Sequence, residues 1–142
     1  MNQQTKSELE TKQLANNMAV KFKGGEVLAL SGELGSGKTT FVQGLAEYFN
    51  IADQVSSPTF TLIQEYKIDN EKFPIIKLIH IDCYRLNNEQ ELINIGIEEY
   101  FNDSTSVVVI EWAEKVKPIV PETADWIEFQ HGSNINERII IS

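Results

Sequence analysis

The chain has 142 residues, of which 42% are hydrophobic and 23% are charged. This length and balance are typical of one compact domain, and they exclude the apolar-poor composition of a disordered chain. The net charge of -9 at pH 7 argues against unaided binding to nucleic acid, which normally needs a basic surface to replace phosphate counterions. We therefore expect a single domain over residues 1–142 that leaves contact with any RNA to another subunit.

Membrane and disulfide classes are also disfavoured. No apolar run approaches the roughly 20 residues that span a bilayer, and residues 1–12 lack the apolar core of a signal peptide. The sequence therefore predicts a cytoplasmic protein without membrane association. Cys83 is the single cysteine, which excludes an internal disulfide and a cysteine-based metal cluster. We interpret it as a small buried residue.

The first third of the chain predicts a helix, a strand and a second helix. A capping-box spacing at Ser7 begins a helix that ends before Gly24. Residues 26–30 predict a short buried strand, and apolar residues recur at helical spacing over 38–50. A glycine-rich segment therefore joins this strand directly to the second helix.

The rest of the chain predicts mainly strands. Alternating apolar residues predict a strand over 59–68, which would form a hairpin with the apolar segment 73–81. Two short helices, a buried strand and a closing hairpin follow, over 88–93, 97–101, 107–110, 126–130 and 137–141.

Residues 32–39, GELGSGKT, match the pattern G-x-x-x-x-G-K-[ST] in full and lie between the predicted strand and helix, where this pattern binds nucleotide phosphates. We call this segment the phosphate loop. Its backbone N–H groups and the helix N-terminus would surround phosphate oxygens, Lys38 would reach the β- and γ-phosphates, and Thr39 would bind Mg²⁺. A plain glycine turn would leave both side chains unexplained. The guanine-reading motif N-K-x-D is absent from the sequence, which favours ATP over GTP.

Two acidic residues follow apolar strands. Asp82 comes after IIKLIHI and Glu111 after VVVI, so each is expected at the carboxyl end of a strand, where ligands of open α/β sheets bind. A nucleotide hydrolase needs such an acid to hold its metal directly or through water. The order of elements and motifs predicts an α/β, P-loop NTPase-like three-layer fold with a central, mostly parallel sheet and antiparallel hairpins at its edges. His80 is interpreted as a packed or hydrogen-bonded residue.

Three further features stay open from the residues alone. The segment SPTFT, residues 57–61, lies about twenty residues after Lys38, where many nucleotide hydrolases have a loop that senses the γ-phosphate; it is equally a turn that enters a strand. Arg85 would balance phosphate charge or pair with an acid. Trp112 would belong to the core or offer a stacking surface.

Several segments together resemble the TsaE family, also called YjeE, of small bacterial ATPases required for threonylcarbamoyladenosine modification of tRNA. They are GELGSGKTTF, SPTFTL, HIDCYRL, GIEEYF and VVVIEWAEK, and they cover about residues 26–115 in the family's order. The combination is far more specific than the phosphate loop alone.

The resemblance implies a site for ATP and Mg²⁺ in which Lys38, Asp82 and Glu111 are catalytic. It implies that Thr39 and Glu111 coordinate Mg²⁺ and that Asp82 positions the attacking water or the outer shell of the metal. Thr59 and Thr61 fall in the segment compared with a switch loop. The residues implied to hold ATP are Gly35, Ser36, Gly37, Lys38, Thr39 and Thr40.

The resemblance also implies partners. In the family the ATPase binds a heterodimer of TsaD and TsaB, in which TsaD is the transferase, and ATP turnover resets the complex without transfer chemistry of its own. Contact with tRNA is then indirect. Slow intrinsic turnover is expected, since the sequence shows no evident second arginine for the transition state apart from Arg85. Two alternatives stay open: a kinase that uses Asp82 as its base, and a binding module that switches without turnover.

Overall fold

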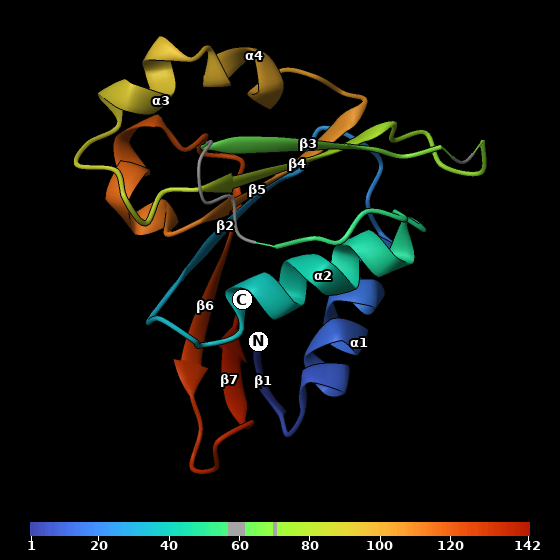
Figure 1. Ribbon diagram of the computed structural model, residues 1–142, viewed down its shortest axis with the longest axis vertical. Helices are drawn as coiled ribbons and strands as arrows, with labels where there is room; N and C mark the ends of the chain where they lie inside the picture. The colour runs from blue at the N-terminus through green and yellow to red at the C-terminus, as the bar shows by residue number, and fades with distance from the viewer. Residues whose placement is uncertain (57–61, 70) are drawn as a thin grey trace.

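The computed structural model describes residues 1–56, 62–69 and 71–142 (Figure 1). The described strands form one sheet in the order β1-β7-β6-β2-β5-β4-β3. They are β1 (Asn2–Thr5), β2 (Val27–Gly32), β3 (Ile63–Lys67), β4 (Lys77–Asp82), β5 (Ser106–Glu111), β6 (Asp125–His131) and β7 (Arg138–Ile141). The helices are α1 (Glu8–Ala19), α2 (Lys38–Tyr48), α3 (Gln90–Asn94), α4 (Ile97–Phe101) and the 3₁₀ helix η1 (Ala113–Ile119).

The centre of the sheet is parallel and its edges are antiparallel. Strand β2 pairs in parallel with β5 and β6, and β4 pairs in parallel with β5. At one edge β3 runs antiparallel to β4, with Ile63 opposite Ile81, and at the other β7 runs antiparallel to β6. The predicted α/β fold with a mostly parallel centre and antiparallel hairpins at its edges is confirmed.

The edge strand β1 was absent from the sequence-based prediction. Its residues, NQQT, carry no apolar alternation, so the pattern that predicts a half-buried strand is missing. The strand forms because β7 would otherwise leave a row of unpaired backbone groups at the edge of the sheet. Asn2 pairs opposite Ile141, which brings the two ends of the chain side by side (Figure 1).

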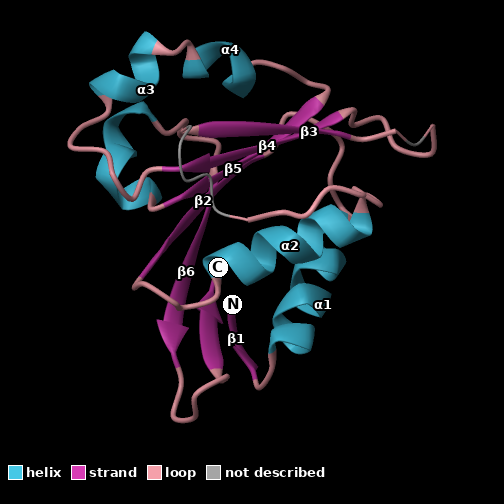
Figure 2. Cartoon of the chain, in the orientation of Figure 1, coloured by secondary structure: helices cyan, strands magenta, loops and turns pink. Residues whose placement is uncertain are grey.

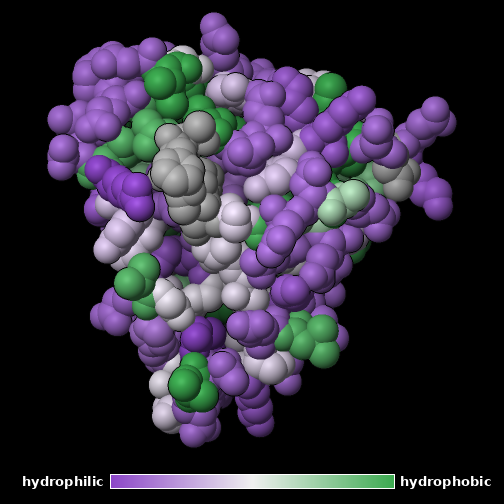
Figure 3. All heavy atoms as spheres, in the orientation of Figure 1, coloured by the Kyte–Doolittle hydropathy of each residue, from purple (hydrophilic) through white to green (hydrophobic). Residues whose placement is uncertain are grey.

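Helices cover both faces of the sheet, so the predicted three layers are present (Figure 2). Helices α1 and α2 pack on one face, and α3, α4 and η1 pack on the other. Hydrophilic side chains dominate the molecular face drawn in Figure 3. Among the described residues, no helix combines the length and apolar character needed to cross a membrane.

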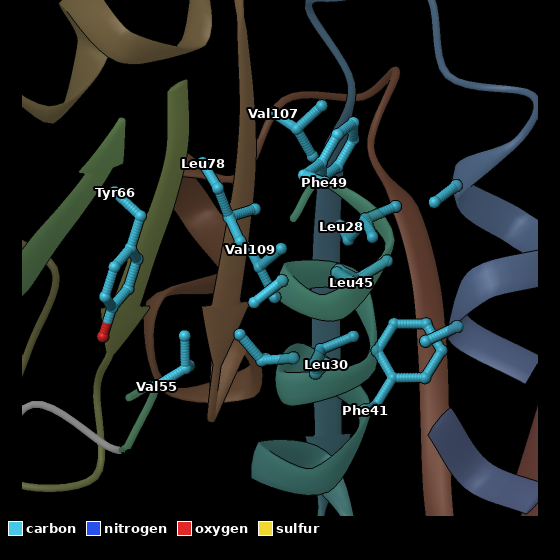
Figure 4. Close-up of a cluster of buried hydrophobic side chains, with 14 of the residues drawn as sticks. Leu28, Leu30, Phe41, Leu45, Phe49, Val55, Tyr66, Leu78, Val107 and Val109 are labelled. Carbon is cyan, nitrogen blue, oxygen red and sulfur yellow. The ribbon is translucent and has the colours of Figure 1, made fainter. Parts of the chain in front are cut away.

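The core beneath α2 follows from helical spacing. Phe41, Leu45 and Phe49 recur every four residues and are almost fully buried. They pack in one cluster with Leu28 and Leu30 of β2 (Figure 4). The Phe41 ring also contacts Phe129 of β6, with 5.5 Å between the ring centroids. The predicted apolar face of this helix is confirmed, and it fixes the helix N-terminus at the carboxyl edge of the sheet.

Alternation along β4 and β5 decides which polar side chains face α2. Successive residues of a strand point to opposite faces, and Leu78 belongs to the cluster beneath α2 whereas Ile79 and Ile81 belong to the opposite cluster. His80 and Asp82 therefore share the face of Leu78. By the same alternation on β5, Glu111 shares the α2 face with Val107 and Val109.

Candidate active site

A pocket of about 550 Å³ lies where β2, β4 and β5 end and α2 begins. It collects the residues implied to hold ATP or metal within the described part of the chain: Gly35, Ser36, Gly37, Lys38, Thr39, Thr40, Asp82 and Glu111. Arg85, Trp112 and Arg138 line it as well. The switch-loop candidates Thr59 and Thr61 lie outside the described residues.

The phosphate loop needs glycine at its turns. Gly35 and Gly37 have φ angles of 72° and 104°, in the left-handed region that favours glycine. At Gly32 a Cβ atom would lie 2.3 Å from the backbone oxygen of Phe129, so any side chain there would displace β6. The N–H groups at the start of α2 have no acceptor within the helix, and with the positive end of the helix dipole they suit a bound anion.

Lys38 is buried at the base of this loop, with 4% of its surface exposed. Its Nζ donates to the backbone oxygens of Gly32 at 2.6 Å and Glu33 at 2.8 Å. It also lies 4.3 Å from the centre of the Trp112 ring. Burial lowers the pKa of Lys38, and nearby carboxylates, Glu111 foremost, oppose that shift. An ammonium that bonds to neutral oxygens is suited to a phosphate anion, because charge-assisted hydrogen bonds are the stronger ones.

Thr39 and Glu111 form the second half of the site. The Thr39 hydroxyl donates to Glu111 Oε1 at 2.8 Å, and Glu111 Oε2 lies 2.5 Å from His80 Nε2. Asp82 is opposite Glu111 in the paired strands β4 and β5, and its Oδ1 accepts from the N–H of Tyr84 at 2.9 Å. His80 is thus buried and hydrogen-bonded, as predicted.

The donor set of Thr39 and Glu111 fits Mg²⁺. Hydroxyl and carboxylate oxygens are ligands that Mg²⁺ accepts, and it is usually held by one or two carboxylates together with substrate phosphates. Within the described residues no group of three or more histidine, cysteine, aspartate or glutamate side chains could hold a metal.

Trp112 has the core role that the sequence left open as one of two alternatives, and it also lines the pocket. Its ring packs against the cluster on the far face of the sheet and also lines the pocket beneath Lys38. Its φ of 59° is unusual for a residue other than glycine. No sequence pattern predicts this backbone conformation directly after Glu111.

Arg138, at the start of β7, lies against the phosphate loop. A Cβ atom at Gly37 would be 3.5 Å from Arg138 Cγ. Arg138 NH1 donates at 2.8 Å to the backbone oxygens of Ile135 and Glu137. Two pocket residues that the sequence reasoning missed, Glu8 and Asn136, come from distant segments, and no motif marks them.

Residues 5–140 match the family model described as "Threonylcarbamoyl adenosine biosynthesis protein TsaE". The chain belongs to the TsaE family. The resemblance drawn from the five sequence segments is thereby confirmed, and the family match extends beyond them into α1 and β7.

Curated relatives agree with this assignment. The chain is 42% identical over 113 residues to the tRNA threonylcarbamoyladenosine biosynthesis protein TsaE of Bacillus subtilis (strain 168), which covers 80% of this chain and 66% of the relative. It is 40% identical over 114 residues to the protein of that name from Aquifex aeolicus (strain VF5), covering 79% and 76%. The chain thus spans slightly less than two thirds of the Bacillus relative, and the matched part of a Rickettsia conorii relative is 62% of its length.

A solved structure has a similar fold. The crystal structure of Bacillus subtilis YdiB superposes with a TM-score of 0.79 at 34% sequence identity. The superposition covers 99% of this chain and 82% of that one. It therefore includes the strands, the α2 N-terminus and the loops from which the pocket is built.

Proposed function

We propose that this TsaE-family chain is an Mg²⁺-dependent ATPase that acts in threonylcarbamoyladenosine modification of tRNA. The observation that carries the proposal is the pocket that joins the phosphate loop, the buried Lys38 and the bonded pair of Thr39 and Glu111. Lys38 and the loop N–H groups hold the β- and γ-phosphates, and Thr39 and Glu111 hold the ion. Mg²⁺ held there would offset the negative charge of the phosphates.

The proposed chemistry is attack of water on the γ-phosphate. The water oxygen bonds to phosphorus while the bond to the β–γ bridging oxygen breaks, giving ADP and phosphate. Asp82 lies beside Glu111 at the pocket, where its carboxylate orients this water. We expect slow turnover by the chain alone, because an arginine supplied by a partner accounts for several orders of magnitude of the rate in related hydrolases.

We further propose the TsaD–TsaB heterodimer as the partner. ATP turnover resets that complex, and the transfer itself belongs to TsaD. The 21 acidic residues outnumber the 12 basic ones, which supports indirect contact with tRNA. A tRNA-modifying role also supports the expectation of a cytoplasmic protein.

Replacement of Lys38 tests the proposal. We expect Lys38→Ala to lower ATP hydrolysis by ~100-fold or more, as loss of one preorganised donor does in other enzymes. The fold should persist, since burial disfavours the charged form of this side chain. Phosphate release and far-UV circular dichroism are the two readouts, and Lys117→Ala, at an exposed position, is the matched control. Unchanged hydrolysis in Lys38→Ala would refute the assignment.

Product identity separates hydrolysis from the kinase alternative. A hydrolase releases free phosphate from ATP when no acceptor is present. A kinase would release little until a hydroxyl-bearing acceptor was supplied, and the γ-phosphate would then be found on that acceptor.

A further inference from the structure

His80 is the buried polar residue beneath the metal-binding pair. Its side chain has no exposed surface, and Glu111 is only 2% exposed. The 2.5 Å contact joins His80 Nε2 to Glu111 Oε2. An ionised carboxylate can only accept a hydrogen bond, so the hydrogen of this contact lies on Nε2. The other ring nitrogen, Nδ1, is buried without a hydrogen-bond partner among the described residues.

The two carboxylate oxygens of Glu111 therefore have different hydrogen-bond partners. Oε1 accepts from the Thr39 hydroxyl at 2.8 Å on the pocket side, whereas Oε2 accepts from His80 on the core side. His80 itself does not line the pocket, so it reaches the nucleotide site through Glu111. A carboxylate held at both oxygens cannot rotate about its last bond without breaking one contact.

We propose that His80 is a positioning residue that fixes the Glu111 carboxylate so that Oε1 faces Thr39 and the metal. The inference rests on the proposed function, in which Thr39 and Glu111 hold Mg²⁺. The physical basis is general: hydrogen bonds to the ligands of a metal orient those ligands, and their loss typically lowers metal affinity by about 10–100-fold.

A positioning role and a packing role predict different effects of substitution at His80. A histidine that only filled space would be replaceable by an apolar residue with no specific effect on Mg²⁺. A histidine that acts through its N–H donor is replaceable by glutamine, whose amide nitrogen reaches about as far from the backbone as Nε2. His80→Leu removes the donor, and His80→Gln keeps it.

Binding of a fluorescent ATP analogue, measured with Mg²⁺ and again with EDTA, tests this without reference to turnover. We expect the wild-type chain to bind more tightly with Mg²⁺. His80→Leu should lose about 10–100-fold of affinity with Mg²⁺ and keep its affinity in EDTA, while His80→Gln should retain most of the Mg²⁺ effect. Ile79→Ala, on the opposite face of the same strand, controls for general destabilisation.

The positioning role of His80 and the proposed function fail in different ways. A wild-type Mg²⁺ effect that persists in His80→Leu, or that is lost equally in His80→Leu and His80→Gln, overturns the positioning role and leaves the proposed function standing. A wild-type chain that binds the analogue in neither condition overturns the proposed function and this inference together. If thermal unfolding shows that His80→Leu does not fold, His80→Asn replaces it, because its amide is too short to reach Oε2.

Discussion

The position of Lys38 favours binding of an anion but disfavours the charged form of its own side chain. In the proposed function its ammonium lies close to the phosphates, yet burial in the loop lowers the pKa of its amine. Below this lowered pKa the folded chain carries a buried charge that disfavours folding, and the penalty disappears as the pH rises and the amine loses its proton. A bound phosphate would relieve the same penalty by charge pairing, so binding and stability are coupled at this side chain.

Cys83 gives a prediction at the residue scale. It is fully buried, and burial raises the pKa of its thiol to about 12. Because the thiolate is the reactive form, the native chain should not react with a thiol reagent at pH 8, and should react fully in denaturant. With a reagent that releases a chromophore on reaction, absorbance measures the labelling of the native and of the denatured chain. Labelling of the native chain at the rate of a free thiol would show that this site opens to solvent.

At the scale of elements, α1 and α2 meet at Gly44. A Cβ atom there would lie 2.7 Å from Lys12 Cα and 2.8 Å from the Lys12 backbone oxygen. Alanine normally stabilises a helix by up to about 1 kcal/mol relative to glycine. We nevertheless expect Gly44→Ala to lower the free energy of unfolding by about 1–2 kcal/mol, because overpacking against backbone outweighs propensity.

Urea denaturation measures the effect of Gly44→Ala, with Gln13→Ala at an exposed position of α1 as a control that should change stability by less than about 0.5 kcal/mol. An increase in stability at Gly44 would mean that the two helices separate readily.

The turn before β5 provides a pH-dependent element. The hydroxyl and N–H of Thr105, followed by the Ser106 hydroxyl, lower the pKa of Asp103 to about 2. The unfolded value is near 4, so this carboxylate stabilises the fold above about pH 4 and the contribution is lost as the pH falls toward 2.

Asp103→Asn should therefore be less stable than wild type at pH 6, and the difference should shrink by pH 2.5. Denaturation at both values measures it, with Asp69→Asn, whose side chain is 85% exposed, as the control. A stability difference that is the same at both pH values would contradict the role given to the Asp103 carboxylate.

Sequence patterns predicted the elements that carry strong local signals. The phosphate loop and α2 combine a complete motif with helical spacing of Phe41 and Leu45, and the structure bears out the strand, loop and helix in that order. Strand β1 could not be predicted, since its polar residues form a strand only through pairing with β7. The contact of His80 with Glu111 depends on the register of β4 against β5, which no single-sequence pattern specifies.

At the scale of the whole molecule, the parallel centre of the sheet is what assembles the site. Strands β2, β4 and β5 deliver the phosphate loop, Asp82 and Glu111 to one edge, where α2 adds its N-terminus. The net charge of -9 belongs to this scale as well, because it disfavours direct contact with nucleic acid and so supports the proposed action through a protein partner.

Phosphate release from ATP and Mg²⁺, by the chain alone and with the TsaD–TsaB heterodimer, tests the central claim most directly. Glu111→Ala is measured alongside, with the exposed Glu122→Ala as its control. The account predicts slow release by the chain alone, a several-fold rise with the heterodimer, and loss of both in Glu111→Ala only. A rate of phosphate release that does not change when the heterodimer is added would contradict the proposed function. So would phosphate that appears on a small acceptor instead of in solution.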